Sequence, residues 1–284
     1  MFAYLVSLAT LVAIFWAVEH VFGNKRGRPW WRPQMTTDVF SGISNALLSN
    51  PLNFVIGFIL GVVILVPAGV IPLETIKSGQ YRGFGPIAAL PRWPQFFLAF
   101  LLGDFLLYWI HRWFHGRTLW RFHAVHHSSE QLDWLSGIRA HPVNDVFANA
   151  MLVFPFILLG FDPVAAASAG PLLGVFALLG HADVDWDWGP LRNAITSPVY
   201  HRWHHSKAPE AIDKNFASFL PLWDILFGTH YMPRDRKPED FGIHEPVTHT
   251  VIGLLKHPFK PSSAGFGRNT ASPPPLPGED RLDT

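Results

Sequence analysis

Five stretches of the 284-residue chain are almost wholly apolar, and polar segments separate them. They cover residues 2–22, 39–70, 95–110, 146–161 and 164–180. A helix needs about 20 apolar residues to cross the hydrocarbon core of a bilayer. The first stretch has this length, the second exceeds it, and the last three are somewhat shorter. The pattern therefore predicts an all-α, integral-membrane helical bundle with about four to five membrane-embedded helices.

Prolines interrupt the second stretch and lie in the connection between the last two. The second contains Pro51 and Pro67 and is long for a single span, so we expect it to be tilted, broken or partly re-entrant. Only Asp162 and Pro163 separate the last two stretches. This short connection predicts a helical hairpin that enters and leaves the membrane on the same side.

The first apolar stretch is followed by a basic and aromatic segment, residues 24–32 (NKRGRPWWR). An excess of Lys and Arg is typical of the cytoplasmic end of a membrane span. This rule places the N-terminus outside the cytoplasm. When the crossings are counted from there, the ends of the third and fifth stretches both lie on the cytoplasmic side.

Composition narrows the possible functions. Apolar residues make up 49% of the chain, charged residues only 15%, and the net charge is +1. The charged share lies below the ~25% of soluble domains, and no basic patch indicates a nucleic acid partner. The chain has no cysteine, which excludes disulfides, thiolate catalysis and Cys-ligated metal sites. A metal ion would therefore be held by His, Asp or Glu.

Eight of the fifteen histidines lie in three short runs, HRWFH, HAVHH and HRWHH. They are His111, His115, His123, His126, His127, His201, His204 and His205. Helical residues three or four apart share a face, so each run can direct two or three imidazoles to a common point. A single such pair is often incidental. Three runs beside apolar spans indicate a di-metal site, because burying so many ring N–H groups without a common partner is costly. Imidazole ligands suit Fe, Zn or Cu better than Mg or Ca.

Two polar residues lie upstream of the first run on the same helical stripe. Asp104 and Tyr108 precede His111 by seven and three residues. An acid inside an apolar span is expected to face the protein interior. Asp104 could accept a hydrogen bond from a ligand imidazole, with Tyr108 nearby, or it could form a polar contact between helices.

Two more histidines lie next to predicted spans. His181 ends the fifth stretch, at the same depth as the three runs, and we expect it to be a ninth metal ligand. His141 lies just before the fourth stretch. It could be a ligand, a residue that orients a ligand, or the residue that begins a helix.

The sequence from Asp104 to His115 (DFLLYWIHRWFH), the HAVHHSS motif and the HRWHH motif together resemble the fatty acid hydroxylase/sterol desaturase superfamily. The resemblance covers about residues 94–229. It implies that the histidine boxes hold a non-haem centre of two Fe ions in a cytoplasmic, histidine-rich cap, with O₂ as co-substrate. It also implies a lipid-like substrate, such as a sterol or fatty acyl chain, and a separate electron-transfer protein that is cytochrome b5-like or a ferredoxin with its reductase.

The chain is accordingly divided into three parts. Residues 1–93 form N-terminal membrane helices with a connecting loop, residues 94–230 form the catalytic region, and residues 231–284 form a C-terminal segment that is disordered from about residue 261. The short gap between the first two boxes resembles the hydroxylase branch, so a lipid C–H hydroxylase is the first hypothesis. A lipid desaturase with the same centre is the alternative, and a non-catalytic metal-binding or transport protein is a third.

Overall fold

The computed structural model describes residues 2–24 and 31–260. Every regular element in these two ranges is helical, and the only strand-like pairings there are two isolated bridges, Gly23 with Val184 and Ser206 with Phe241. The predicted all-α class is therefore confirmed for the described residues. Two of the segments considered above lie outside the described residues. They are residues 25–30 of the basic segment and the C-terminal segment from residue 261 that we predicted to be disordered.

Three helical stretches of the described chain are long and apolar enough to cross a membrane. They are α2 (Met35–Leu60) with the π-helical turn Gly61–Leu65, α5 (Arg92–Phe114), and α8 (Pro163–Ala167) with α9 (Gly170–His181). Two apolar helices are shorter in the part described, Ala9–Phe22 of α1 (Phe2–Phe22) and α7 (Pro142–Leu158). Whether these two are also membrane-embedded stays a prediction.

The second apolar stretch is one long helix with an altered last turn. α2 continues through Pro51, becomes π-helical from Gly61 to Leu65, and the helical run stops before Pro67. At a rise of about 1.5 Å per residue, 31 residues span about 46 Å, more than the ~30 Å hydrocarbon core. A tilted span would accommodate this length.

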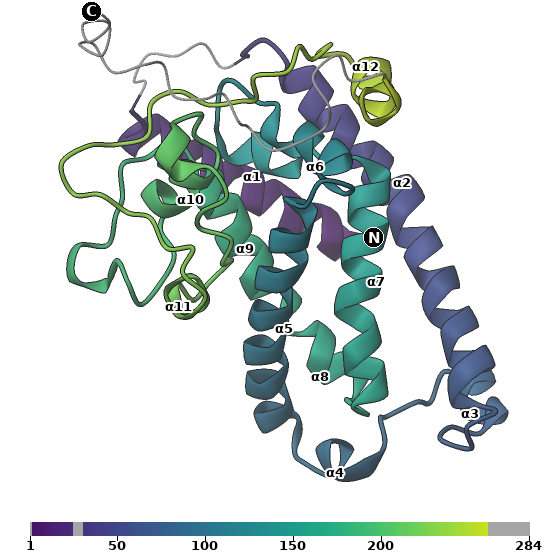
Figure 1. Cartoon of the computed structure of the whole chain (residues 1–284). Coiled ribbons are helices and arrows are strands. Elements are labelled where there is room, and N and C mark those ends of the chain that lie inside the picture. The colour runs from purple at the N-terminus through teal and green to yellow at the C-terminus, as the bar shows by residue number, and fades with distance from the viewer. Residues whose placement is uncertain (1, 25–30, 261–284) are drawn as a thin grey trace, which may run out of the picture.

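The long helices pack through small polar residues. The axes of α2, α7 and α5 are roughly parallel, with α7 between the other two, and the chain runs through α5 in the opposite direction (Figure 1). Ser41 and Asn45 of α2 donate hydrogen bonds to the carbonyl oxygen of Ala140, just before α7, at 2.9 and 3.4 Å. The opposite face of α2 is apolar and exposed, with Phe54 76% accessible. Small polar residues at helix contacts and apolar residues outside are typical of membrane bundles.

Helix α1 is not aligned with these helices. Figure 1 shows it crossing behind the bundle at a large angle. Near its end, the Glu19 carboxylate accepts hydrogen bonds from the backbone N–H groups of Trp134 (2.8 Å) and Asp183 (2.9 Å), and Phe15 stacks on Trp134. The end of α1 is therefore attached to the histidine-rich part of the chain.

Short helices form a cap over one end of the bundle, while α3 (Leu73–Ser78) and α4 (Gly85–Ala88) lie at the other end (Figure 1). The cap helices are α6 (Trp120–His127), α10 (Pro198–His204) and α12 (Val251–Lys256), whereas α11 (Leu222–Leu226) lies beside α5. Four 3-10 turns accompany them, at Trp134–Ile138, Gly189–Leu191, Pro209–Ala211 and His257–Phe259. Because α5 and α9 end at the cap, their last turns face α6 and α10.

Candidate metal centre

The nine histidines predicted as ligands come from four helices that meet in the cap. The last turn of α5 and its C-cap provide two, α6 provides three, the last residue of α9 provides one, and α10 with its C-cap provides three. The structure brings all nine together, but around two points rather than one.

Each point is surrounded by ring nitrogens that lie within 4.8 Å of one another. Group A consists of His111, His115, His123, His127 and His204. Group B consists of His126, His181, His201 and His205. The two groups adjoin each other, since the ring centroids of His127 (group A) and His205 (group B) are 4.3 Å apart.

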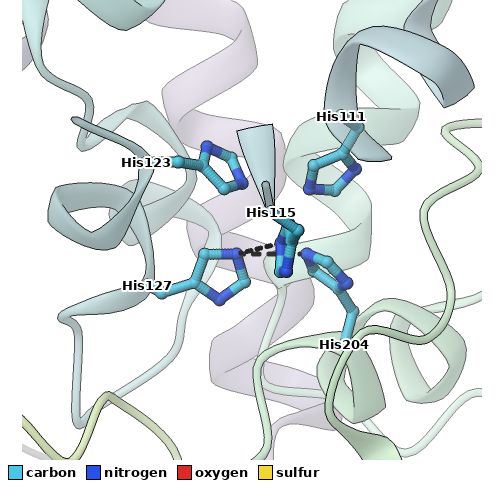
Figure 2. Close-up of side chains that lie close together, drawn as sticks. All are labelled: His111, His115, His123, His127 and His204. Carbon is cyan, nitrogen blue, oxygen red and sulfur yellow. Dashed lines mark hydrogen bonds between the residues drawn. The ribbon is translucent and has the colours of Figure 1, made fainter. Parts of the chain in front are cut away.

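The Nε2 atoms face inward in both groups. In group A, the Nε2 atom of His127 lies 3.2 Å from that of His115 and 3.1 Å from that of His204 (Figure 2). In group B, the Nε2 atom of His181 lies 3.1 Å from that of His126 and 3.2 Å from that of His201. Such short contacts place several ring nitrogens around one central volume.

Backbone carbonyls fix the orientation of four of these rings. In each case the Nδ1–H group donates to a carbonyl oxygen, which can only accept. The pairs are His111 with Phe216 (2.9 Å), His126 with Arg139 (2.9 Å), His181 with Ala177 (2.7 Å) and His204 with Lys214 (2.7 Å). In a neutral imidazole whose Nδ1 carries the proton, Nε2 presents a lone pair, so four lone pairs point into the two groups.

Side-chain oxygens orient two further rings of group A. His115 donates from Nδ1 to the Asp213 carboxylate at 3.1 Å, and His123 donates from Nδ1 to the Asn144 amide oxygen at 3.0 Å. Metal-bound histidines almost always donate their other ring N–H in this way. The buried Nε2 atoms of His111 and His123 have no hydrogen-bond partner in the described chain. Two unprotonated Nε2 atoms cannot hydrogen-bond to each other, so the arrangement fits a cation between them.

Burial keeps the imidazoles outside the spans neutral. It holds the pKa of His127, His204 and His205 well below the ordinary 6.5, and neighbouring imidazoles lower these pKa values further. Burial also lowers the pKa of His126 to about 4. A ligand must be deprotonated to bind a metal, and these rings already are at neutral pH.

A small cavity of about 30 Å³ lies beside group A. His115, His127 and His204 line it together with Asp213 and Ser206. This is room for a water-sized molecule but not for a lipid.

Asp104 contacts a loop rather than an imidazole. Its carboxylate accepts hydrogen bonds from the backbone N–H groups of Phe219 (2.8 Å) and Leu220 (3.0 Å) and from the indole of Trp223 (2.8 Å). Of the two interpretations of Asp104, the polar contact between elements is the one the geometry matches. It attaches α5 to the segment before α11.

Tyr108 lies one layer behind the histidines. It is fully buried, accepts a hydrogen bond from Arg112 at 2.9 Å, and shares one with Thr229 at 3.0 Å. Thr229 donates in turn to the Asp224 carboxylate at 2.6 Å. Tyr108 is thus part of a buried hydrogen-bond network next to group A. In the described chain its ring packs against the aromatic rings of Trp109, Phe216 and Phe227.

His141 begins a helix and belongs to neither group. Its Nδ1 atom accepts a hydrogen bond from the N–H group of Val143 at 3.1 Å, which caps α7. Its Nε2–H group donates to the carbonyl of Leu255 at 3.3 Å. Both ring nitrogens are engaged by the backbone, so of the three roles considered for His141 the geometry matches the residue that begins a helix.

The sequence did not reveal the residues that orient the rings. Asn144 follows His141 by three residues, and Asp213 follows the third box by eight, with no periodic spacing to mark either. The only sequence signal for this segment is weak: it is the polar run from Asp213 to Asn215. In the structure Asp213 and Asn215 have left-handed backbone angles, with φ of 57° and 58°. Such angles are several-fold enriched in Asn and Asp.

Comparisons with known proteins agree with this geometry. Residues 96–229 match the profile of the family described as fatty acid hydroxylase. An ornithine lipid hydroxylase of Rhizobium tropici is 35% identical over 172 residues, which cover 59% of this chain and 52% of that protein. An alkylglycerol monooxygenase of Danio rerio is 35% identical over 151 residues, 53% of this chain and 33% of that protein.

A more distant relative is a Delta(7)-sterol 5(6)-desaturase of Gibberella zeae, 27% identical over 142 residues, 49% of this chain and 38% of that protein. The chain therefore spans about a third to a half of the length of these relatives. No solved structure matches. The matched region contains all nine clustered histidines, and the predicted resemblance is confirmed: residues 96–229 are similar to the fatty acid hydroxylase/sterol desaturase superfamily.

Proposed function

We propose that groups A and B each hold one iron ion and that the protein is a membrane-bound oxygenase that hydroxylates a C–H bond of a lipid. The observation that carries the proposal is the pair of adjoining groups of inward-facing Nε2 atoms at the end of an apolar helical bundle. Three relatives are named as a lipid hydroxylase, a monooxygenase and a desaturase. These names support the proposal that this chain is an oxidoreductase.

The donor set supports iron. Imidazole ligands suit Fe, Cu, Ni or Zn. Zinc has no redox chemistry, so it could not serve an oxidation by O₂. When bound, two iron ions would supply the activation of O₂ that carbon hydroxylation needs, while the protein supplies binding and orientation.

The residues of the chain have three tasks in this proposal. The hydrogen bonds from Nδ1 hold the imidazoles in one tautomer and one orientation. The cavity beside group A admits molecules the size of O₂ or water from the polar side of the cap. The apolar helices α5, α7 and α9 hold the alkyl part of a lipid below the groups and exclude water from them.

The overall reaction defines what must be supplied from outside. Hydroxylation converts one C–H bond, O₂, two electrons and two protons into one C–OH bond and one H₂O. Desaturation removes two hydrogens from neighbouring carbons and, with the same electrons and protons, gives two H₂O. We propose that a separate redox protein delivers the electrons to the cap, which the positive-inside rule places in the cytoplasm.

The comparisons favour oxygen insertion. The relatives with 35% identity are by name a hydroxylase and a monooxygenase, whereas the desaturase is 27% identical. A metal transporter, by contrast, would need ligands along a pore at the depth of the spans. The histidines lie together at one end of the bundle, which disfavours transport.

Product analysis tests the proposal. Cells that express the chain are grown under ¹⁸O₂, and their lipids are compared by mass spectrometry with those of cells expressing His126→Ala. The matched control is His244→Ala, an exposed histidine outside both groups. We expect ¹⁸O in a lipid with wild type and the control but not with His126→Ala. A product lacking two hydrogens and without ¹⁸O would establish the desaturase, and unchanged lipids with wild type would refute both.

A further inference from the structure

Groups A and B differ in what holds their imidazoles. Three of the five rings in group A are oriented by a single segment, residues 213–217, through the Asp213 carboxylate and the carbonyls of Lys214 and Phe216. Neither orienting carbonyl of group B belongs to this segment, since they come from Arg139 and from Ala177 of α9. A change in this segment is therefore expected to disturb the orientation of the group A imidazoles rather than those of group B.

The carboxylate of Asp224 holds one end of the segment. It is fully buried and accepts hydrogen bonds from the backbone N–H groups of Phe216 (2.9 Å) and Ala217 (2.7 Å). It also accepts from the hydroxyl groups of Thr229 (2.6 Å) and Tyr200. Four donors to one buried carboxylate make a rigid attachment, because charge-assisted hydrogen bonds are about twice as strong as neutral ones.

The side chain of Asn215 holds the middle of the segment. It is fully buried, and its amide group donates to the carbonyls of Tyr200 (2.9 Å) and Tyr231 (2.7 Å). Its amide oxygen accepts from the N–H group of Tyr231 at 2.7 Å. These three bonds use both N–H donors of the amide and one of the two lone pairs of its oxygen. They hold residue 215 in its left-handed conformation.

Group B is supported by different contacts. Arg139, whose carbonyl orients His126, donates from Nε to Asp38 of α2 at 2.5 Å and from Nη2 to Gln34 at 3.0 Å. Asp38 also pairs with Arg32 at 2.5 Å. Among the hydrogen bonds of the described chain, none joins Asp224 or the Asn215 side chain to Arg139 or Asp38.

On the basis of the proposed metal centre, we infer that Asp224 and Asn215 are positioning residues for the metal ion of group A and not for that of group B. They act through residues 213–217, which keep three imidazoles turned toward the metal position. The two metal positions can therefore be weakened independently.

Titration of the metal-free, detergent-solubilised full chain with Co²⁺ tests the inference. Wild type is expected to show two tight positions. Asp224→Asn places an amide N–H₂ against a backbone N–H, and Asn215→Gly removes the side chain but tolerates the left-handed backbone. Both are expected to lower the affinity of one position by about 10- to 100-fold and leave the other unchanged.

Two backgrounds identify the weakened position. In His201→Ala/His205→Ala, which disrupts group B, Asp224→Asn must still weaken the remaining position. In His115→Ala/His204→Ala, which disrupts group A, it must have no further effect. Asp162→Asn is the matched control, because it makes the same acid-to-amide change at a buried carboxylate that belongs to neither group and accepts from the N–H group of Val164 and from Arg92. It should bind Co²⁺ like wild type.

Equal weakening of both positions, or none, by Asp224→Asn and Asn215→Gly would overturn the inference and leave the proposed function intact, provided that wild type binds two Co²⁺ ions. Wild type that binds no Co²⁺ would instead overturn the proposed metal centre itself. Far-ultraviolet circular dichroism on each variant shows whether the helices are retained, and Asn215→Gly keeps the test decisive if Asp224→Asn does not fold.

Discussion

A methyl group added at Gly137 would press on a histidine of group B without removing any ligand. Gly137 lies in the 3-10 turn Trp134–Ile138, and a Cβ atom there would meet the His181 ring at 2.9 Å from Nδ1 and 3.0 Å from Cγ. Favourable contacts between heavy atoms lie at about 3.5–4.0 Å. The His181 ring must therefore shift by roughly half an ångström or more, which disturbs its hydrogen bond to the Ala177 carbonyl.

The expected magnitude follows from this overlap. Overpacking a well-filled site by one methyl group costs about 1–3 kcal/mol. At about 1.4 kcal/mol per factor of ten, that corresponds to roughly 5- to 150-fold weaker metal binding at group B. The Nε2 atom of His181, now 3.1–3.2 Å from two other ring nitrogens, would leave the shared volume.

Titration of metal-free Gly137→Ala with Co²⁺ measures this effect directly. Gly174→Ala is the matched control, because Gly174 lies in the same helix as His181 and a Cβ atom there would meet nothing within 4 Å. We expect one weakened position in Gly137→Ala and wild-type binding in Gly174→Ala. If Gly137→Ala binds both ions within twofold of wild type, displacing the His181 ring does not weaken metal binding. That result would refute the role of His181 as a ligand of group B.

Three further predictions concern the residues around the groups. Asp213→Ala removes the partner of His115, so Co²⁺ titration should show about 10-fold weaker binding at group A, and unchanged affinity would contradict the orienting role. His141→Ala removes the cap of α7 and should lower the free energy of unfolding by about 0.5–2 kcal/mol in thermal melts while the iron content stays unchanged. The metal-free protein should lose stability as the pH falls below about 6.5, because burial lowers the pKa of His204 and His205 in the folded state and only the unfolded chain gains their protons. Thermal melting between pH 8 and pH 5 checks the sign, and a melting temperature that rises toward acid would contradict it.

The histidine spacing predicted that the three runs cluster, because helical geometry alone makes residues three and four apart share a face. It did not predict how the runs divide between the groups. His123 and His127 of α6 point to group A, whereas His126 points to group B. On a helix, positions 123 and 127 differ by only about 40° around the axis, while 126 lies about 60° to the other side of 123. One face therefore serves two neighbouring points.

The rest of the site depended on tertiary contacts that carry no local signal. The carbonyl oxygens that orient the rings belong to the backbone, so no residue type marks them in the sequence. His141 precedes a span as a ligand would, but whether its ring turns inward or caps α7 depends on the position of Leu255, more than 100 residues away. The oblique path of α1 likewise follows from contacts of Glu19 with distant segments.

We propose above that groups A and B each bind one iron ion. The most direct test is the iron content per chain of protein purified from membranes, measured by mass spectrometry against the protein concentration. We expect two iron ions per chain in the wild-type protein and about one in His201→Ala/His205→Ala, which retains only group A intact. A purified chain that oxidises lipid with O₂ but contains no iron would contradict it.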